Sequence, residues 1–455
     1  MKRKKTIVAI ATAVGKSGIG IVRVSGTQVL LVVKKILKVP LKERYAHYLP
    51  FLDFKNNIID QGIVLLFLAP NSFTGEDILE FHGHGNLIVL NLLIKNILLI
   101  PHIRLAKPGE FSKRAFLNKK IDLIQAESIC DVINADSEAE IHASLQSLNG
   151  YFSKCLHKII KKLNKLSVNL EISVNFPEEI AEKKFFFKKI ENQLIKIICL
   201  FHKIHTTASQ GCLIHEGIKV ILTGPPNVGK SSLFNRLLQR KVSIVTKISG
   251  TTRDILREKI CLNTLNIELL DTAGIHDNPE KIEKIGIKFA LKEIELCHYI
   301  FLVLDSQNNE NFNLRYILKG IQRLKSFQKL IIIFNKIDLL SDKISLKNYP
   351  TGYTYFFISV KKNFGISKIF NYLENISNTR DEMKSIFLSR QRHIKLLKNA
   401  LFFLEKGKKD WLNFFSIECL LDNIRLAKNS IFQITGKFSH EELLKKIFSK
   451  FCIGK

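Results

Sequence analysis

A phosphate-binding loop is the clearest chemical feature of this sequence. Residues 224–231 read Gly-Pro-Pro-Asn-Val-Gly-Lys-Ser and match the pattern G-x-x-x-x-G-K-[ST]. They follow an apolar run expected to be a strand and precede a helical run, which is the context that the motif needs. The glycines let backbone N–H groups face phosphate oxygens, while Lys230 is expected to reach the β- and γ-phosphates and Ser231 to ligate Mg²⁺. A nucleotide site is therefore predicted here.

Three further motifs extend the site, and one of them identifies the nucleotide as GTP. Asp271-Thr-Ala-Gly274 offers a carboxylate for the Mg²⁺ shell and a backbone N–H for the γ-phosphate. In Asn335-Lys-Ile-Asp338, the terminal carboxylate can accept from two N–H donors on one edge of guanine, a pair that adenine lacks. Ser359-Val-Lys361 is expected to close over the base. Motifs that follow successive strands match the usual ligand position in open α/β sheets.

Hydrolysis of GTP also requires a group that orients the attacking water. Ile275 directly follows the Asp-Thr-Ala-Gly stretch, and its side chain cannot hydrogen-bond to water. Two acids, Glu280 and Glu283, stand downstream of Pro279 in a stretch expected to open a helix. The spacing does not decide which of these two acids orients the water, and both also suit a solvated first helical turn.

The apolar pattern divides the 455 residues into four segments. Residues 1–118 mix strand-like runs with glycine and proline turns, and residues 119–216 carry helical periodicity. Residues 217–377 alternate apolar strands with helices, and residues 378–455 return to helical periodicity. The third segment indicates an α/β domain with a mostly parallel sheet, inserted into a helical domain whose two halves pack together. Its expected strands are 218–223, 267–270, 299–304, 329–334 and 355–358.

Composition excludes several classes of protein. With 46% hydrophobic and 24% charged residues, the chain is not expected to be disordered. The apolar stretch Leu87–Ile100 is too short to span a bilayer and is interrupted by polar residues. The eight cysteines form no C-x-x-C pair, so we expect neither a disulfide framework nor a zinc ribbon, and a cytoplasmic location fits best. The basic and then apolar N-terminus imitates a signal peptide, but two strands around a turn at Gly15–Gly18 fit equally well.

The formal net charge of +29 has two explanations. One is a polyanionic partner such as RNA, attracted through its phosphates. The other is codon bias, because the chain is rich in Lys, Ile, Asn and Phe. The sequence leaves both open.

Motifs outside the nucleotide site resemble a known family. Gly250-Thr-Thr-Arg-Asp254 and the terminal Phe451-Cys-Ile-Gly-Lys455 are similar to stretches of the MnmE (TrmE) family of tRNA modification GTPases. The resemblance covers essentially the whole chain. Further similar stretches are residues 6–9, 20–26, 71–77, 83–85, 107–112, 115–118 and 125–127.

The resemblance implies a fold and a function. The fold class is α/β plus all-α and multidomain: an N-terminal α+β folate-binding-like domain, and a helical domain interrupted by an inserted Ras-like P-loop GTPase domain. The family works as a homodimer through its N-terminal domains and joins an FAD-containing MnmG subunit in a heterotetramer. Together they add a carboxymethylaminomethyl or aminomethyl group at C5 of the tRNA wobble uridine, with formyl-tetrahydrofolate as the expected one-carbon donor.

Site residues follow from the resemblance, position by position. The reduced folate would be held by Arg23, Glu80, Lys120 and Lys455. The water-orienting acid falls on Glu283, and Mg²⁺ falls on Ser231 and Thr252. Potassium would be held by Asn227, Thr246, Ile248 and Thr251. The expected GTP-binding residues are Asn227, Val228, Gly229, Lys230, Ser231, Ser232, Thr246, Lys247, Ile248, Ser249, Gly250, Thr251, Thr252, Asp271, Thr272, Ala273, Gly274, Asn335, Lys336, Asp338, Ser359, Val360 and Lys361.

Three alternatives remain beside these assignments. His82-Gly-His84 has a metal-like spacing, but two histidines without further clustered ligands are more typical of a structural role. Cys452 stands where the family carries a cysteine near the one-carbon site, and a small buried apolar residue would serve as well. The chain could also be an RNA- or ribosome-associated regulatory GTPase without one-carbon chemistry, although such a switch would not need residues 1–118 or 451–455.

Overall fold

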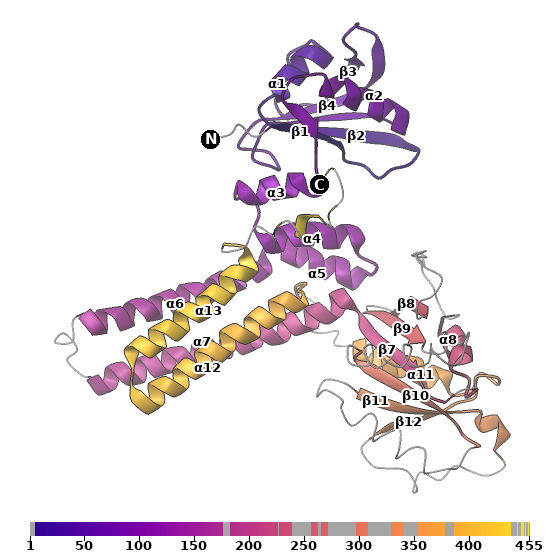
Figure 1. Cartoon of the computed structure of the whole chain (residues 1–455), viewed down its shortest axis with the longest axis vertical. Helices are drawn as coiled ribbons and strands as arrows, with labels where there is room; N and C mark the ends of the chain where they lie inside the picture. Colours follow the sequence, from indigo (N-terminus) through magenta and orange to yellow (C-terminus); the bar gives the residue numbers. More distant parts are fainter. Residues whose placement is uncertain are drawn as a thin grey trace, which may run out of the picture. The chain divides into compact units, whose positions relative to one another are not determined.

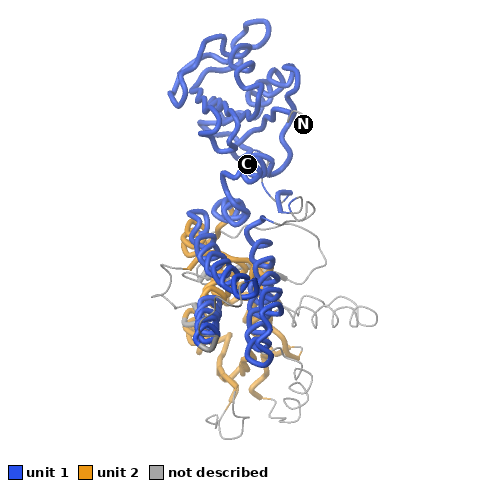
Figure 2. Tube along the Cα trace, turned by 90° about the vertical axis from the view of Figure 1, so that its left-hand side faces the viewer, with its two compact units in different colours: residues 1–133, 147–202, 395–455 blue, residues 134–146, 203–394 orange. Residues whose placement is uncertain are grey.

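The computed structural model describes residues 5–175, 183–225, 227–238, 256–262, 265–271, 297–307, 329–340, 353–377 and 386–437, with residues 444, 447–449, 451 and 454. The chain forms two compact units, coloured separately in Figure 2. The first is drawn from residues 1–133, 147–202 and 395–455, and the second from residues 134–146 and 203–394. Each unit therefore combines segments that are far apart in the sequence.

The first unit contains a six-stranded sheet in the order β3-β4-β5-β2-β1-β6 (Figure 1). Its strands are β1 (Thr6–Ile10), β2 (Ser17–Ser25), β3 (His47–Leu52), β4 (Ile58–Phe67), β5 (Ile78–Gly85) and β6 (Ile103–Leu105). The pairs are antiparallel except for β1 with β6. The two strands expected around a turn at Gly15–Gly18 are present as β1 and β2, although β2 already begins at Ser17, within the expected turn.

Alternation along the strands separates the two faces of this sheet. Val22 and Val24 of β2 are fully buried and belong to the core beneath α1 (Val29–Val32), η1 (Val33–Leu37) and α2 (Leu87–Leu98). Arg23, between them, therefore lies on the opposite face. There α3 (Glu110–Leu117) packs Phe111 against Ile7 and Ala9 of β1. The sequence thus places one cation of the expected folate site on the α3 face.

Long helices complete the first unit. They are α4 (Leu123–Asn134), α6 (Tyr151–Asn175), α7 (Lys183–Glu216), α12 (Gln391–Phe414) and α13 (Ile417–Thr435). The division between the units falls within α7 and near the start of α12, and most of α5 (Glu138–Leu148) belongs to the second unit. Helices α6 and α13 lie side by side, and Lys428 Nζ donates to Asn164 Oδ1 at 3.3 Å (Figure 1). The rings of Phe187 on α7 and Trp411 on α12 pack edge to face, with their centroids 5.2 Å apart. Helices from both sides of the inserted segment therefore pack together, as the fold class requires.

The apolar stretch at 87–100 forms the 12-residue helix α2, with four of its hydrophobic residues buried against the sheet. Asn86 caps this helix by accepting a hydrogen bond from the N–H of Ile88. Across the described ranges, we find no helix with the length and apolarity needed to cross a membrane.

The second unit contains another six-stranded sheet, in the order β12-β11-β10-β7-β9-β8. Its strands are β7 (Ile218–Thr223), β8 (Leu256–Leu262), β9 (Leu265–Asp271), β10 (Tyr299–Asp305), β11 (Lys329–Asn335) and β12 (Thr354–Phe357). All pairs are parallel except β8 with β9. The five strands expected from the sequence are confirmed, whereas the edge strand β8 was not expected.

Both faces of this sheet are buried, which explains its continuous apolar strands. Phe301 and Val303 of β10 belong to one core, and Ile300 and Leu302 belong to the other. Helices α8 (Lys230–Leu238) and α11 (Ile366–Ser377) contribute to the first of these cores. The multidomain arrangement matches the predicted fold class, while the residue boundaries of the four sequence segments stay predictions.

Candidate functional site

The phosphate-binding loop joins β7 to α8, as its sequence context predicts. The Nζ atom of Lys230 donates to the carbonyls of Gly224 at 3.0 Å and Pro225 at 2.7 Å. Lys230 is 7% exposed, so these carbonyls partly replace the water that its ammonium group loses on burial. Phosphate oxygens are stronger acceptors for such a cation, because the hydrogen bond is then charged on both sides. The lysine is therefore held inside the loop, where its ammonium group can donate to phosphate oxygens in place of the two carbonyls.

Asn335 connects the loop to the base-recognition motifs. Its Nδ2 donates to the carbonyl of Val228 at 2.9 Å, and its Oδ1 accepts from the N–H of Val360 at 3.2 Å. The residue is 3% exposed. Gly229 has a φ of +93°, and a Cβ there would lie 2.4 Å from Asn335 Nδ2. Only glycine accommodates both this backbone conformation and this close approach.

The residues expected to bind guanine follow β11 and β12. Lys336, at a left-handed φ of 64°, donates from Nζ to Asp305 Oδ2 at 2.7 Å. A hydrogen bond from the Ser359 side chain lowers the pKa of the Asp338 carboxyl, so this group is ionised at neutral pH. An ionised carboxylate accepts hydrogen bonds but donates none, which suits the donor edge of guanine.

Asp305 was missed by sequence reasoning. It is the last residue of β10 and pairs in register with Asn335 of β11. One signal in the sequence was available. It is a carboxylate at the end of an apolar strand that neighbours two strands carrying motifs. Its ion pair positions Lys336, which the sequence had assigned to GTP without a partner.

Part of the expected GTP site lies outside the described residues. These are Thr246, Lys247, Ile248, Ser249, Gly250, Thr251, Thr252, Thr272, Ala273, Gly274 and Glu283, and Glu280 lies outside as well. Asp271 ends β9 and pairs in register with Leu222 of β7, next to the strand that leads into the phosphate loop. Asn227 lies within the loop at a φ of 61°. The described residues therefore bring together the phosphate loop and the two base-recognition motifs.

A second polar cluster lies on the α3 face of the first unit's sheet. The Nε of Arg23 donates to Glu80 Oε1 at 2.7 Å, and the two residues are cross-strand partners on β2 and β5. The guanidinium of Arg23 lies 5.8 Å from the centre of the Phe111 ring, within the range of a cation–π contact. The structure thus joins two of the four residues expected to hold folate, and adds an aromatic ring that the sequence did not single out.

The C-terminal segment reaches this cluster. Arg23 Nη1 donates to the carbonyl of Gly454 at 3.3 Å. Gly454 has a φ of +100°, and a Cβ there would lie 2.1 Å from the carbonyl oxygen of Ile10. Lys120 lies with its side chain near the turn at Gly75. Lys455 lies outside the described residues, as does Cys452.

The two histidines with metal-like spacing have separate partners. His82 Nε2 lies 3.2 Å from Glu80 Oε2, and His84 Nδ1 lies 2.7 Å from Asp60 Oδ1. Among the described residues, no group of three His, Cys, Asp or Glu side chains is arranged to hold a metal ion. The geometry of these residues fits the structural role.

Comparisons with known families cover nearly all of the chain. A family described as the GTP-binding protein TrmE N-terminus matches residues 6–120, and one described as the MnmE helical domain matches residues 123–452. The chain belongs to the MnmE family. The resemblance noted in the terminal Phe-Cys-Ile-Gly-Lys motif and in residues 250–254 is thereby confirmed, together with the multidomain fold class.

Several MnmE proteins are similar over their full length, and each is named tRNA modification GTPase MnmE. The relative from Buchnera aphidicola subsp. Cinara cedri is 48% identical over 455 residues, 100% of both chains. That from Baumannia cicadellinicola subsp. Homalodisca coagulata is 45% identical over 99% of both chains. That from Mannheimia succiniciproducens is 42% identical over 100% of both chains. Among solved structures, the G domain of the T. maritima FeoB iron transporter covers 35% of this chain and 99% of its own, at 27% identity and a TM-score of 0.27.

Proposed function

We propose that this chain is the GTP-hydrolysing subunit of a complex that modifies tRNA. The modification is a carboxymethylaminomethyl or aminomethyl group at C5 of the wobble uridine. Full-length similarity to proteins named tRNA modification GTPase supports this proposal. The alternative of a bare regulatory switch is not favoured, because the family match extends through residues 6–120, which a switch would not need.

The bridging position of Asn335 is the observation that carries the GTP assignment. One side chain holds the phosphate loop through Val228 and the base-closing segment through Val360. Binding the guanine edge at Asp338 and the phosphates at Lys230 thus acts on one connected structure. Because the phosphate loop and the base-closing segment are already held together, less ordering is needed when GTP binds across both, and this favours binding.

The phosphate loop carries one expected ligand for each of two cations, Ser231 for Mg²⁺ and Asn227 for K⁺. Ser231 follows Lys230 directly at the start of α8, so a hydroxyl, which suits the hard Mg²⁺ ion, stands beside the phosphate-binding lysine. Ser231 and Thr252 would hold Mg²⁺, which neutralises charge on the phosphates. Asn227, Thr246, Ile248 and Thr251 would hold K⁺, which supplies the charge stabilisation that an arginine finger gives in other GTPases.

Water would be oriented by Glu283, as the family resemblance implies. Ile275 cannot perform this role because its side chain has neither a donor nor an acceptor. The two residues lie outside the described part of the chain, so this assignment depends on the resemblance and on the sequence.

The Arg23–Glu80 cluster fits a reduced folate. Glu80 Oε1 accepts from Arg23 and Oε2 lies beside His82, yet a carboxylate has about four acceptor positions. Its remaining positions can accept from the N–H groups of a pterin ring. The side chains of Arg23 and Glu80 are 19% and 15% exposed, so solvent reaches both. Lys120 and Lys455 would complete the site, and the folate supplies the one-carbon unit.

The assembly follows the family. We propose a homodimer formed through the N-terminal domains, a heterotetramer with an FAD-containing MnmG-type subunit, tRNA as substrate and a cytoplasmic location. The relatives' names support the involvement of tRNA. The dimer and the flavoprotein partner are carried by the resemblance alone.

Hydrolysis assays on the purified full-length chain test the proposed function. GTP should be hydrolysed and ATP should not, because adenine lacks the pair of donors that Asp338 accepts. Turnover should be faster in KCl than in NaCl at equal ionic strength and fixed Mg²⁺, because Na⁺ is too small for ligands placed for K⁺. Equal hydrolysis of ATP and GTP would overturn the assignment of the nucleotide.

A further inference from the structure

A cavity of about 460 Å³ lies in the first unit beside α3. It is lined from three parts of the sequence: Lys5 before β1, the segment 104–117, and Phe448 and Ser449 near the C-terminus. This cavity is on a different side of α3 from the Arg23 cluster. Glu110, Lys113, Arg114 and Leu117 recur at helical spacing and line the cavity, whereas Phe111, below Arg23, points into the core between α3 and β1.

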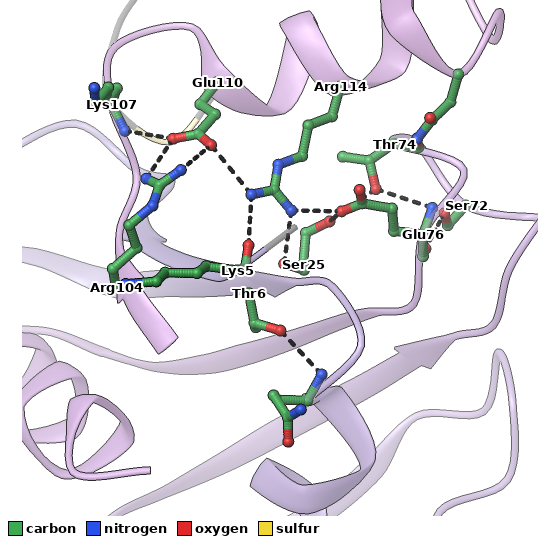
Figure 3. Close-up of polar contacts among 12 residues, drawn as sticks. Lys5, Thr6, Ser25, Ser72, Thr74, Glu76, Arg104, Lys107, Glu110 and Arg114 are labelled. Carbon is green, nitrogen blue, oxygen red and sulfur yellow. Dashed lines mark hydrogen bonds and ion pairs between the residues drawn. The ribbon is translucent and has the colours of Figure 1, made fainter. Parts of the chain in front are cut away.

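Five cationic side chains and a single carboxylate line the cavity. The carboxylate of Glu110 already accepts hydrogen bonds from neighbouring side chains, as Figure 3 shows. It accepts from Arg104 Nη1 at 2.7 Å and from Arg104 Nη2 at 2.5 Å, and Arg114 Nη2 donates to it at 3.1 Å. Arg114 also donates to Glu76 Oε2 at 2.7 Å. Both arginines of the lining are therefore held by ion pairs with carboxylates.

The three lysines differ from the arginines. Within the described residues, no hydrogen bond or ion pair is found for the ammonium groups of Lys5, Lys107 and Lys113. Lys5 and Lys107 are exposed and Lys113 is half-buried. Because Glu110 is saturated by the arginines, it does not neutralise these lysines. Among the described residues, the cavity is therefore lined by three lysine ammonium groups that have no ion-pair partner.

Apolar surface lies among these charges. Leu117 is 49% exposed and Pro108 is also exposed, and both line the cavity, whereas Phe448, which lines it too, is buried at 2% exposure. Exposed apolar groups between lysines suit a ligand that has anionic groups joined by less polar parts. A nucleic acid strand has this composition, since phosphates alternate with sugars and bases.

We propose that this cavity binds the phosphate backbone of RNA, with Lys5, Lys107 and Lys113 as the phosphate contacts. Lysine carries a compact charge on a flexible stem, which suits contacts to phosphates that do not depend on base sequence. The net charge of +29 favours approach of such a strand to any part of the chain, whereas this cavity provides a defined place for it. The identity of the RNA as tRNA rests on the proposed function.

Salt dependence of tRNA binding tests this site. The variant Lys107→Gln/Lys113→Gln removes two charges, and Lys34→Gln/Lys35→Gln is the matched control. Lys34 and Lys35 are exposed residues of η1, on the opposite face of the same sheet. Binding of an unmodified tRNA transcript to each full-length chain would be measured by fluorescence anisotropy between about 50 and 200 mM KCl.

We expect the slope of log K against log salt to fall by about 1 for each lysine removed, or about 2 in the cavity variant. Affinity at about 0.1 M salt should fall about tenfold or more. The control variant should retain the slope of the unmodified chain, and Lys107→Arg/Lys113→Arg should retain it as well. An unchanged slope in the cavity variant, or an equal decrease in the control, would overturn the proposal.

A separate readout distinguishes this site from the proposed function. GTP hydrolysis by the unmodified chain without tRNA tests the enzyme assignment and does not involve the cavity. A loss of folate-induced fluorescence change in the cavity variant, with tRNA binding retained, would assign these lysines to folate and overturn the RNA site. Thermal unfolding of each variant shows whether the substitutions preserve the fold.

Discussion

The side-chain amide of Asn335 donates to the backbone carbonyl of Val228 at 2.9 Å, across 107 positions of the sequence. Asn335 thereby fixes the phosphate loop relative to the strand that carries the guanine-recognition residues. Its Oδ1 simultaneously accepts from the N–H of Val360, so the third motif shares the same side chain. The segments proposed to bind the two ends of GTP are therefore physically connected.

Replacing Asn335 with aspartate should break one half of this bridge. Asn335→Asp keeps the acceptor for Val360 but loses the donor for Val228 and leaves a carboxylate facing a carbonyl. We expect GTP affinity to fall by about 1–3 kcal/mol, which is about fivefold to 150-fold. Titration with a fluorescent guanine nucleotide measures this loss. The control Asn164→Asp changes an asparagine on α6 and should bind like the unmodified chain, and an equal effect in both variants would contradict the bridge.

Asp338→Asn should relax guanine specificity. The carboxylate accepts from two donors of guanine, whereas an amide mismatches one of them and can donate to the C2 carbonyl of xanthine. We expect the ratio of GTP to xanthosine triphosphate affinity to fall by roughly tenfold or more. Competition between the two nucleotides measures the ratio. Full retention of the GTP preference would show that Asn335–Asp338 does not read the base.

Glu283→Ala and Glu280→Ala form a matched pair for the water-orienting acid. Loss of one positioning group typically lowers turnover by about 10²–10⁴-fold, so Glu283→Ala should bind GTP normally and hydrolyse it very slowly. Glu280→Ala should hydrolyse GTP at nearly the original rate. Single-turnover hydrolysis and nucleotide affinity would be measured for both. Normal hydrolysis by Glu283→Ala would place the water-orienting group elsewhere.

Glu110 should stabilise the first unit in a pH-dependent manner. Burial alone raises the pKa of this carboxyl, but hydrogen bonds from Arg104, from the Lys107 backbone and from Arg114 lower the pKa to about 2. A depressed folded-state pKa contributes stability that is present above the unfolded value of about 4.5 and is lost as the pH falls toward 2. Allowing for solvent screening, we expect Glu110→Gln to cost roughly 1–2 kcal/mol at pH 7.

Hydrogen exchange measures this cost locally, because peptides that contain α3 report its opening directly. Exchange in α3 should accelerate in Glu110→Gln at pH 7. Glu43→Gln is the matched control, because Glu43 is exposed and its Oε1 lies 3.7 Å from Nε of Arg44. Identical α3 protection in Glu110→Gln and the unmodified chain would show that the network in Figure 3 adds no stability.

Much of the fold could be predicted because local patterns determined it. Apolar runs predicted five strands of the second sheet, and all are present since both faces of that sheet are buried. Strand β8 was missed because its sequence, Leu-Arg-Glu-Lys-Ile-Cys-Leu, combines charges with apolar residues, as suits an edge strand. The local pattern of the basic N-terminus could not be told from that of a signal peptide. What identifies β1 is its pairing with the next strand, β2, and with β6, which is remote in sequence.

The candidate site was predictable to a different extent. Motif spacing predicted roles for Lys230, Asn335 and Asp338, because a phosphate loop and a base-recognition loop have local sequence requirements. The ion pair of Lys336 with Asp305 and the position of Phe111 below Arg23 were not predictable, because each joins separate elements. Arg23 and Glu80 were expected from the family resemblance alone, since their spacing of 57 positions carries no pattern until β2 and β5 pair.

Nucleoside mass spectrometry of cellular tRNA tests the central claim most directly. tRNA would be analysed from cells lacking this chain, and from the same cells supplied with the unmodified chain or with Lys230→Ala. The account predicts that the carboxymethylaminomethyl or aminomethyl group at C5 of the wobble uridine is lost without the chain. It predicts that the unmodified chain restores the group and that Lys230→Ala does not, because the phosphate-binding lysine is removed. Persistence of the modified uridine in cells lacking the chain would contradict the account.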